Sequence, residues 1–319
     1  MATPASACTG QFAPHRRGAH TAHLVVTYHY VREHNSDGVT GVTPQEFAGQ
    51  IRSIQAQYRV VTVEEFAVQH VHEGGLAVIT FDDALRDQAV AASILDDHGL
   101  PGVFFAPMRP YSDEPDHWCP QHLLHALADE LGWAELERRV GPHLAGVEID
   151  ADEADRLYHY EVPHKRRLKY ALAFALPAAE AAAVLREVNA GIGLRADDWY
   201  LTAAQLRALE DAGHALGGHG FDHLPYNTLS PKAQAADMHR AVRLMNQLFG
   251  TLPRALAYPF GRFTSVTAAL ARACGYIHTF TTEDRVDAKF VRDEITRRAN
   301  ATADPRVDRA CSGRPPCRP

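Results

Sequence analysis

The feature that most constrains this chain is an apolar run that ends in two neighbouring acids. Residues 78–83 read Val-Ile-Thr-Phe-Asp-Asp, and the β-branched and aromatic residues predict a buried strand. Two adjacent carboxylates are costly to bury without a positive partner, and a metal ion can be that partner. Asp82 and Asp83 are therefore candidate site residues. The plainer alternative is a helix N-cap followed by an acid in the first helical turn.

A second candidate group is the pair His219 and His223, which follows the apolar run 214–218. On one helical turn, a spacing of four residues would place both imidazoles on the same side, within reach of one metal ion. One Asp with two His leaves a coordination position for water, as hydrolytic metal sites require. The chain has 19 His, so the pair alone could arise by chance. The interpretation depends on both motifs ending apolar runs, because barrel enzymes place ligands at the ends of strands.

These motifs, in this order, resemble those of the polysaccharide deacetylase family of metal-dependent carbohydrate esterases. The similar segments are Thr80-Phe-Asp-Asp-Ala84, His219-Gly-Phe-Asp-His223, Ala257-Tyr-Pro-Phe-Gly261 and, for one branch, Thr27-Tyr-His-Tyr-Val31. The resemblance covers residues 23 to 300, interrupted by an insert. It implies an α/β fold, a distorted (β/α)7 barrel, and removal of an N-acetyl group from a sugar or glycoconjugate.

The resemblance also implies roles for single residues. Asp82 matches the general base, and the Phe260 backbone N–H takes the place of the donor that stabilises the oxyanion. Asp83, His219 and His223 match the ligands of one divalent metal ion, and zinc suits one carboxylate and two imidazoles.

The sequence departs from the family pattern at the proton donor. The late Leu-x-His motif, which supplies the usual general acid, has no clear match. We therefore expect His29, at the end of the first predicted strand, to donate a proton to the leaving amine. The alternative is a neutral His29 packed in the core. Ala84 stands where the family usually has Gly, and this replacement would be unfavourable if the residue had a positive φ.

The rest of the chain alternates predicted strands and helices, as parallel sheets and barrels do. Strands are expected near 23–31, 59–62, 76–81, 102–106, 214–218, 256–259 and 276–281, and helices near 43–58, 63–72, 84–98, 202–212, 230–249 and 264–274. A barrel domain is expected over 23–303, between a flexible segment (1–22) and a disordered tail (304–319). Residues 107–199 instead predict a helical insert with helices near 122–139, 151–158, 165–176 and 178–190. The insert is expected to pack on the barrel, form an oligomer or line the substrate pocket.

Composition excludes several classes of function. A net charge of −7 and a pI near 6.2 give no basic surface for nucleic acid or anionic membranes. No apolar run reaches the ~18 residues of a membrane helix, and the N-terminus lacks a signal-peptide core, so we expect no membrane insertion and a cytoplasmic enzyme. The five scattered cysteines indicate neither a disulfide framework nor a structural zinc site. The expected partner is an N-acetylated sugar or another acetamide. The alternatives are a hydrolase of a non-sugar amide or imide and a non-catalytic member of the fold.

Overall fold

The computed structural model describes residues 23–70, 74–159 and 161–282, and the backbone of 295–297 and 299–300. The predicted N-terminal segment 1–22 and the predicted tail 304–319 lie outside these residues.

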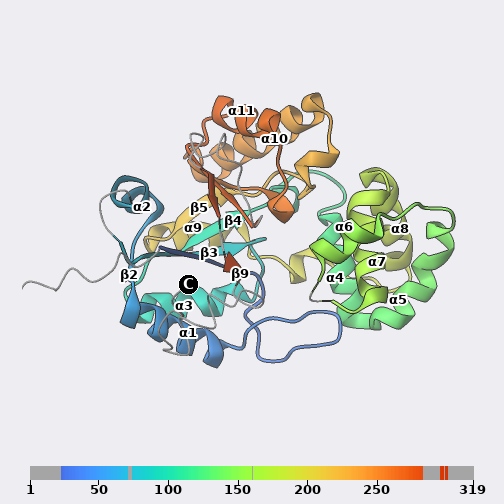
Figure 1. The fold of residues 1–319 in the computed structure, drawn as a ribbon, viewed down its shortest axis with the longest axis horizontal. Helices are drawn as coiled ribbons and strands as arrows, with labels where there is room; N and C mark the ends of the chain where they lie inside the picture. Colours follow the sequence, from blue (N-terminus) through green and yellow to red (C-terminus); the bar gives the residue numbers. More distant parts are fainter. Residues whose placement is uncertain (1–22, 71–73, 160, 283–294, 298, 301–319) are drawn as a thin grey trace, which may run out of the picture.

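The architecture is built on one parallel sheet (Figure 1). Its strands are β1 (Leu24–Tyr28), β2 (Arg59–Val60), β3 (Leu76–Asp82), β4 (Val103–Ala106), β5 (Ala215–Gly218), β6 (Ala255–Ala257), β7 (His278–Thr281), β8 (Ile295–Arg297) and β9 (Ala299–Asn300). The strand order is β8-β7-β6-β5-β4-β3-β1-β9, and β2 pairs with β3. Because β8 pairs with β7 while β9 pairs with β1, these two short strands contact both ends of the strand order. The predicted α/β fold of the distorted-barrel type is thereby confirmed, with the parallel strands forming a curled sheet.

Helices surround one face of the curled sheet, while strand residues such as Val25, Val78 and Phe105 pack against one another on the other face. In Figure 1, α1 (Pro44–Gln57) and α3 (Gln88–Asp97) lie on one side of the strands, while α10 (Pro231–Phe249) and α11 (Ser265–Ala273) lie on the other. The predicted capping box at Thr43 is confirmed, because its side chain accepts from the Glu46 N–H while Glu46 accepts from Thr43. The main core cluster joins strand residues such as Ile79 to helix residues such as Ile51 and Leu95.

The insert is a group of helices with its own core, between β4 and β5. It contains α4 (Pro120–Leu131), α5 (Trp133–Val140), α6 (Ala151–Leu157), α7 (Pro163–Tyr170) and α8 (Ala178–Ala190), which lie together at the right of Figure 1. Its apolar cluster includes Leu124, Trp133 and Leu185. Despite the insert, β4 and β5 are neighbours, with Val103 opposite Ala215.

Two predicted helices differ in their extent. The helix expected over 122–139 is divided at Gly132, which has φ +75° and joins α4 to α5. The helix expected from Ala84 begins instead at Gln88. Asp83 and Ala84 have positive φ, and Leu85 forms an isolated bridge with Tyr200, so the chain after β3 turns before it becomes helical.

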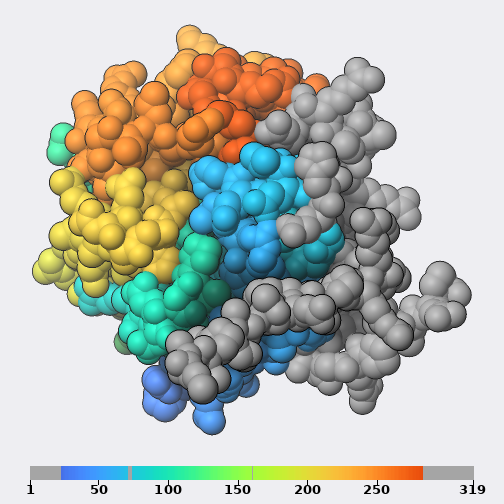
Figure 2. Space-filling view, turned by 90° about the vertical axis from the view of Figure 1, so that its left-hand side faces the viewer, coloured from blue at the N-terminus to red at the C-terminus, as the bar shows by residue number. Residues whose placement is uncertain are grey.

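Figure 2 shows the end of the molecule away from the insert. There α2 (Val63–Gln69, blue), α9 (Ala203–Asp211, yellow) and the α10–α11 region (orange) lie side by side on the surface. None of the helices in the described part of the chain has the length and apolar character that a membrane span needs.

Candidate metal centre

The carboxyl ends of neighbouring parallel strands bring the predicted site residues to one edge of the sheet. Asp82 is the last residue of β3, His219 follows β5 and His29 follows β1. Phe260 lies in the short turn Pro259–Gly261 after β6. In barrels of parallel strands this edge carries the functional side chains.

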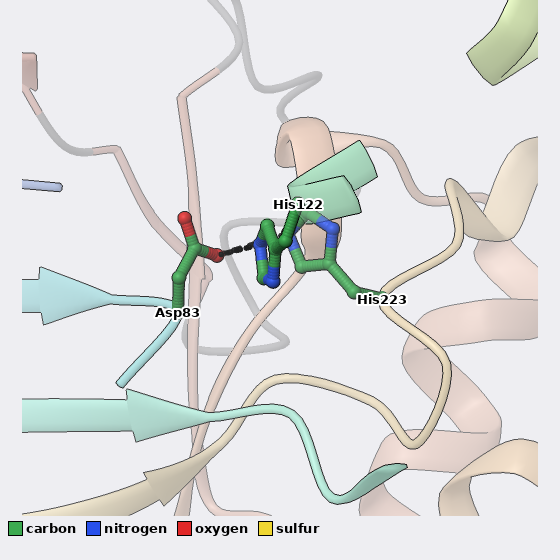
Figure 3. Close-up of side chains that lie close together, drawn as sticks. All are labelled: Asp83, His122 and His223. Atoms are coloured by element: carbon green, nitrogen blue, oxygen red, sulfur yellow. Dashed lines mark ion pairs between the residues drawn. The ribbon is translucent and has the colours of Figure 1, made fainter. Parts of the chain in front are cut away.

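Three imidazoles surround one carboxylate oxygen at this edge. Asp83 Oδ1 lies 3.1 Å from His223 Nε2, 3.2 Å from His122 Nε2 and 3.3 Å from His219 Nε2. All four side chains are buried. Figure 3 shows the carboxylate of Asp83 directed toward the rings of His122, from a helix, and His223, from a loop.

Three of these four side chains, without His219, form a group compact enough to hold a divalent metal ion. The ligand atoms of Asp83, His122 and His223 all lie within 4.8 Å of one another. Asp83 Oδ1 and His122 Nε2 have no hydrogen-bond partner among the described residues. Buried polar atoms without hydrogen bonds are unfavourable, and a cation bound to the carboxylate and imidazoles would satisfy them.

His122 was not expected in this cluster. It lies in the first turn of α4 of the insert, directly before the apolar residues Leu123 and Leu124. In the sequence it resembles a histidine that packs in the insert core. The only local signal is His125 three residues later, which would lie on the same helical face, but His125 bonds instead to Tyr30 and Gln121.

The predicted helical turn between His219 and His223 is wrong. The segment is a loop in which His223 has φ +55°. Asp237 of α10 holds this loop, because its carboxylate accepts from the backbone N–H groups of Phe221 and Asp222. Two histidines four residues apart therefore meet through a turn that a distant carboxylate stabilises.

His219 is oriented for metal binding by its second ring nitrogen. His219 Nδ1 lies 2.8 Å from the Ala257 carbonyl oxygen, which can only accept a hydrogen bond. A proton is therefore on Nδ1, and the neutral form of the ring carries on Nε2 the lone pair that a ligand needs.

The charges of the cluster depend on one another. Burial alone would raise the pKa of Asp83, but the His122 and His223 imidazoles hold it well below its usual range. Burial lowers the pKa of His223 to about 4. Burial also opposes the charged form of His219, yet the neighbouring Asp82 and Asp83 carboxylates raise its pKa overall.

The backbone of the centre is strained. Asp83 (φ +80°), Ala84 (φ +52°), His223 (φ +55°) and Phe260 (φ +57°) are the non-glycine residues with positive φ in the described part of the chain. Each such residue costs about 1–3 kcal/mol, and such residues concentrate at functional sites. Ala84, which stands where the family usually has Gly, therefore has the positive φ that is unfavourable for a residue with a side chain.

The remaining predicted residues lie beside the cluster. Asp82 Oδ2 is 3.8 Å from His29 Nε2 and 3.9 Å from His219 Nε2. The His29 side chain is 34% exposed and Asp82 only 4%, so His29 lies between the buried acid and solvent. The Phe260 ring is 5.1 Å from the His223 ring.

Known proteins resemble the chain in sequence and in fold. A family model described as polysaccharide deacetylase matches residues 180–278. YxkH of Bacillus subtilis (strain 168), a polysaccharide deacetylase by name, is 31% identical over 84 residues, which are 26% of this chain and 30% of that protein. The match thus spans less than a third of the relative's length.

Solved structures share the architecture over most of the chain. IcaB from Ammonifex degensii has a TM-score of 0.55 and 17% identity, with 92% of this chain and 96% of that chain covered. The Streptococcus pyogenes deacetylase PplD, in complex with acetate, has a TM-score of 0.53 and 14% identity, with 88% and 93% covered. At these identities the likeness concerns the fold. The family model over residues 180–278, the sequence relative and the fold all show similarity to polysaccharide deacetylases.

Proposed function

We propose that the protein hydrolyses the N-acetyl group of an acetylated sugar with one divalent metal ion, zinc, held by Asp83, His219 and His223. The observation that supports this most directly is the convergence of imidazole nitrogens on Asp83 Oδ1 at 3.1–3.3 Å. Asp82, a second buried acid, lies beside them. The chemistry that such an ion supplies when bound is activation of water and polarisation of a carbonyl.

The chain's own residues provide the proton transfers. Asp82, at the end of β3, takes a proton from the attacking water. His29, 3.8 Å from Asp82 and partly exposed, gives a proton to the departing amine. The Phe260 N–H donates to the oxyanion that forms on the acetamide. Burial of Asp82 and Asp83 keeps bulk water from competing with these contacts.

The test is acetate release from a panel of N-acetylated oligosaccharides and nucleotide sugars, with simple non-sugar amides and imides included. The purified protein should contain about one equivalent of metal, and chelation should abolish turnover until zinc is restored. Asp82→Asn is the matched inactive control. Turnover only on the non-sugar compounds would contradict the sugar substrate, and a metal-loaded protein without any turnover would contradict the enzymatic role.

A further inference from the structure

The insert reaches the centre through a chain of contacts that begins at Tyr200. His122 Nδ1 is 2.7 Å from the Tyr200 hydroxyl, and His122 Nε2 is on the opposite side of the ring, 3.2 Å from Asp83 Oδ1. The His122 side chain is 1% exposed. Its Nε2 makes no hydrogen bond to any residue that the structure describes. A buried nitrogen aimed at a carboxylate and two further imidazoles is placed as a ligand would be.

The surroundings of Tyr200 favour the tautomer that can bind a metal. The Tyr200 hydroxyl oxygen accepts the Cys119 backbone N–H at 3.3 Å, and the hydroxyl also makes a side-chain hydrogen bond with Cys119. The Tyr200 hydroxyl can donate its proton to the Cys119 sulfur. The Tyr200 oxygen is then available to accept from His122 Nδ1–H, which leaves the lone pair on Nε2.

Tyr200 is also fixed to the segment that carries Asp83. Leu85 bridges Tyr200, the Leu201 N–H donates to the Ala84 carbonyl, and the Arg86 N–H donates to the Trp199 carbonyl. The end of the insert thus pairs with the residues that directly follow Asp83. The contacts therefore form a closed loop. It runs from Asp83 through the bridge between Leu85 and Tyr200 to the Tyr200 hydroxyl, and from there through His122 back to Asp83.

We propose that His122 is a protein ligand of the metal ion and that Tyr200 is its positioning residue, so that the helical insert supplies part of the metal centre. The inference rests on the proposed function, since it adds one nitrogen donor to Asp83, His219 and His223. A zinc site can expand to five donors, so the added imidazole leaves a position for water. Loss of the ligand should weaken metal binding by more than the ~10–100-fold that outer partners contribute.

The experiment measures metal binding without using catalysis. Wild type, His122→Gln, Tyr200→Phe and His125→Gln are stripped of metal, checked for equal folding by circular dichroism, and titrated with Zn²⁺ against a chromophoric chelator. The same proteins are loaded with Co²⁺, whose visible absorption reports the number and geometry of its ligands. His125 is the matched control, because it lies on the same helix, is half-buried and forms its own hydrogen bonds.

Support requires that His122→Gln loses about 100-fold or more in Zn²⁺ affinity and changes the Co²⁺ spectrum. Tyr200→Phe should lose ~10–100-fold while keeping the spectral shape, and His125→Gln should resemble wild type. An unchanged affinity and spectrum in His122→Gln would overturn the inference while leaving the proposed function intact, since His122 would then only contact Asp83. An equal loss in His125→Gln would also overturn it, because the cause would be a disturbed helix. A wild-type protein that binds no divalent ion would contradict the proposed function itself.

Discussion

Asp82 and Asp83 are adjacent in sequence but face different partners. Asp83 Oδ1 is surrounded by imidazole nitrogens at 3.1–3.3 Å, whereas Asp82 Oδ2 is 3.8–3.9 Å from His29 and His219. We expect Asp82→Asn to keep the metal and to lower turnover ~10²–10⁴-fold, because it removes only the base. Asp83→Asn should weaken metal binding as well, by at least ~10-fold. Metal content and acetate release, measured on the same preparations, test the two roles. If both variants kept full metal content and full turnover, the two acids would serve only the turn after β3.

His29 is a second test at the scale of single residues. A poor leaving group such as an amine needs a proton, whereas an activated ester does not. His29→Ala should therefore lower turnover on an acetamide by ~10²-fold or more, affect an activated acetyl ester much less, and leave the metal content unchanged. An equal loss on both substrates would show that His29 is structural. No loss on either would leave both proton transfers to Asp82.

At the scale of elements, the loop between His219 and His223 depends on helix α10. Asp237 accepts two backbone N–H groups of this loop and the Tyr226 hydroxyl. Asp237→Ala leaves these buried donors without an acceptor, which should destabilise the protein by about 1–3 kcal/mol and weaken metal binding. Urea unfolding and chelator competition measure the two effects. His239→Ala, an exposed position on the same helix, should change neither, and a wild-type affinity in Asp237→Ala would show that the loop does not need this support.

The sequence predicted those elements whose signals are local. The capping box at Thr43 and the Gly250 that ends α10 with φ +73° depend only on neighbouring residues. The helical turn between His219 and His223 was wrong because the loop is set by Asp237, a carboxylate fourteen residues beyond His223. The contact of His122 with Asp83 depends on how the insert folds back on the barrel, which no periodicity in α4 reveals.

At the scale of the whole molecule, the stability should depend on pH through Asp87. Burial raises the pKa of this carboxyl from 3.8 to about 7 in the folded protein. Between these values the unfolded chain releases the proton and the folded chain keeps it, so stability falls by ~1.4 kcal/mol per pH unit over that window. The contribution is fully present below about pH 4 and is lost as the pH rises through 7.

Asp87→Asn removes this dependence. The variant should therefore unfold at a higher temperature than wild type at pH 8, and the difference should disappear near pH 4. Thermal unfolding at several pH values is the measurement, with Asp97→Asn, an exposed site on the same helix, as the control. A difference that is the same at pH 4 and pH 8 would contradict the role assigned to Asp87.

The left-handed backbone of Asp83, Ala84, His223 and Phe260 has a consequence for protein engineering. A residue in this region is an obvious target for replacement by glycine, which adopts positive φ without steric cost. Such a change at His223 would remove a side chain of the metal cluster, and at Phe260 the ring that packs beside it. A laboratory selection for heat resistance alone would therefore favour substitutions at the residues on which the chemistry depends. The thermostable variants that it recovers would include inactive proteins.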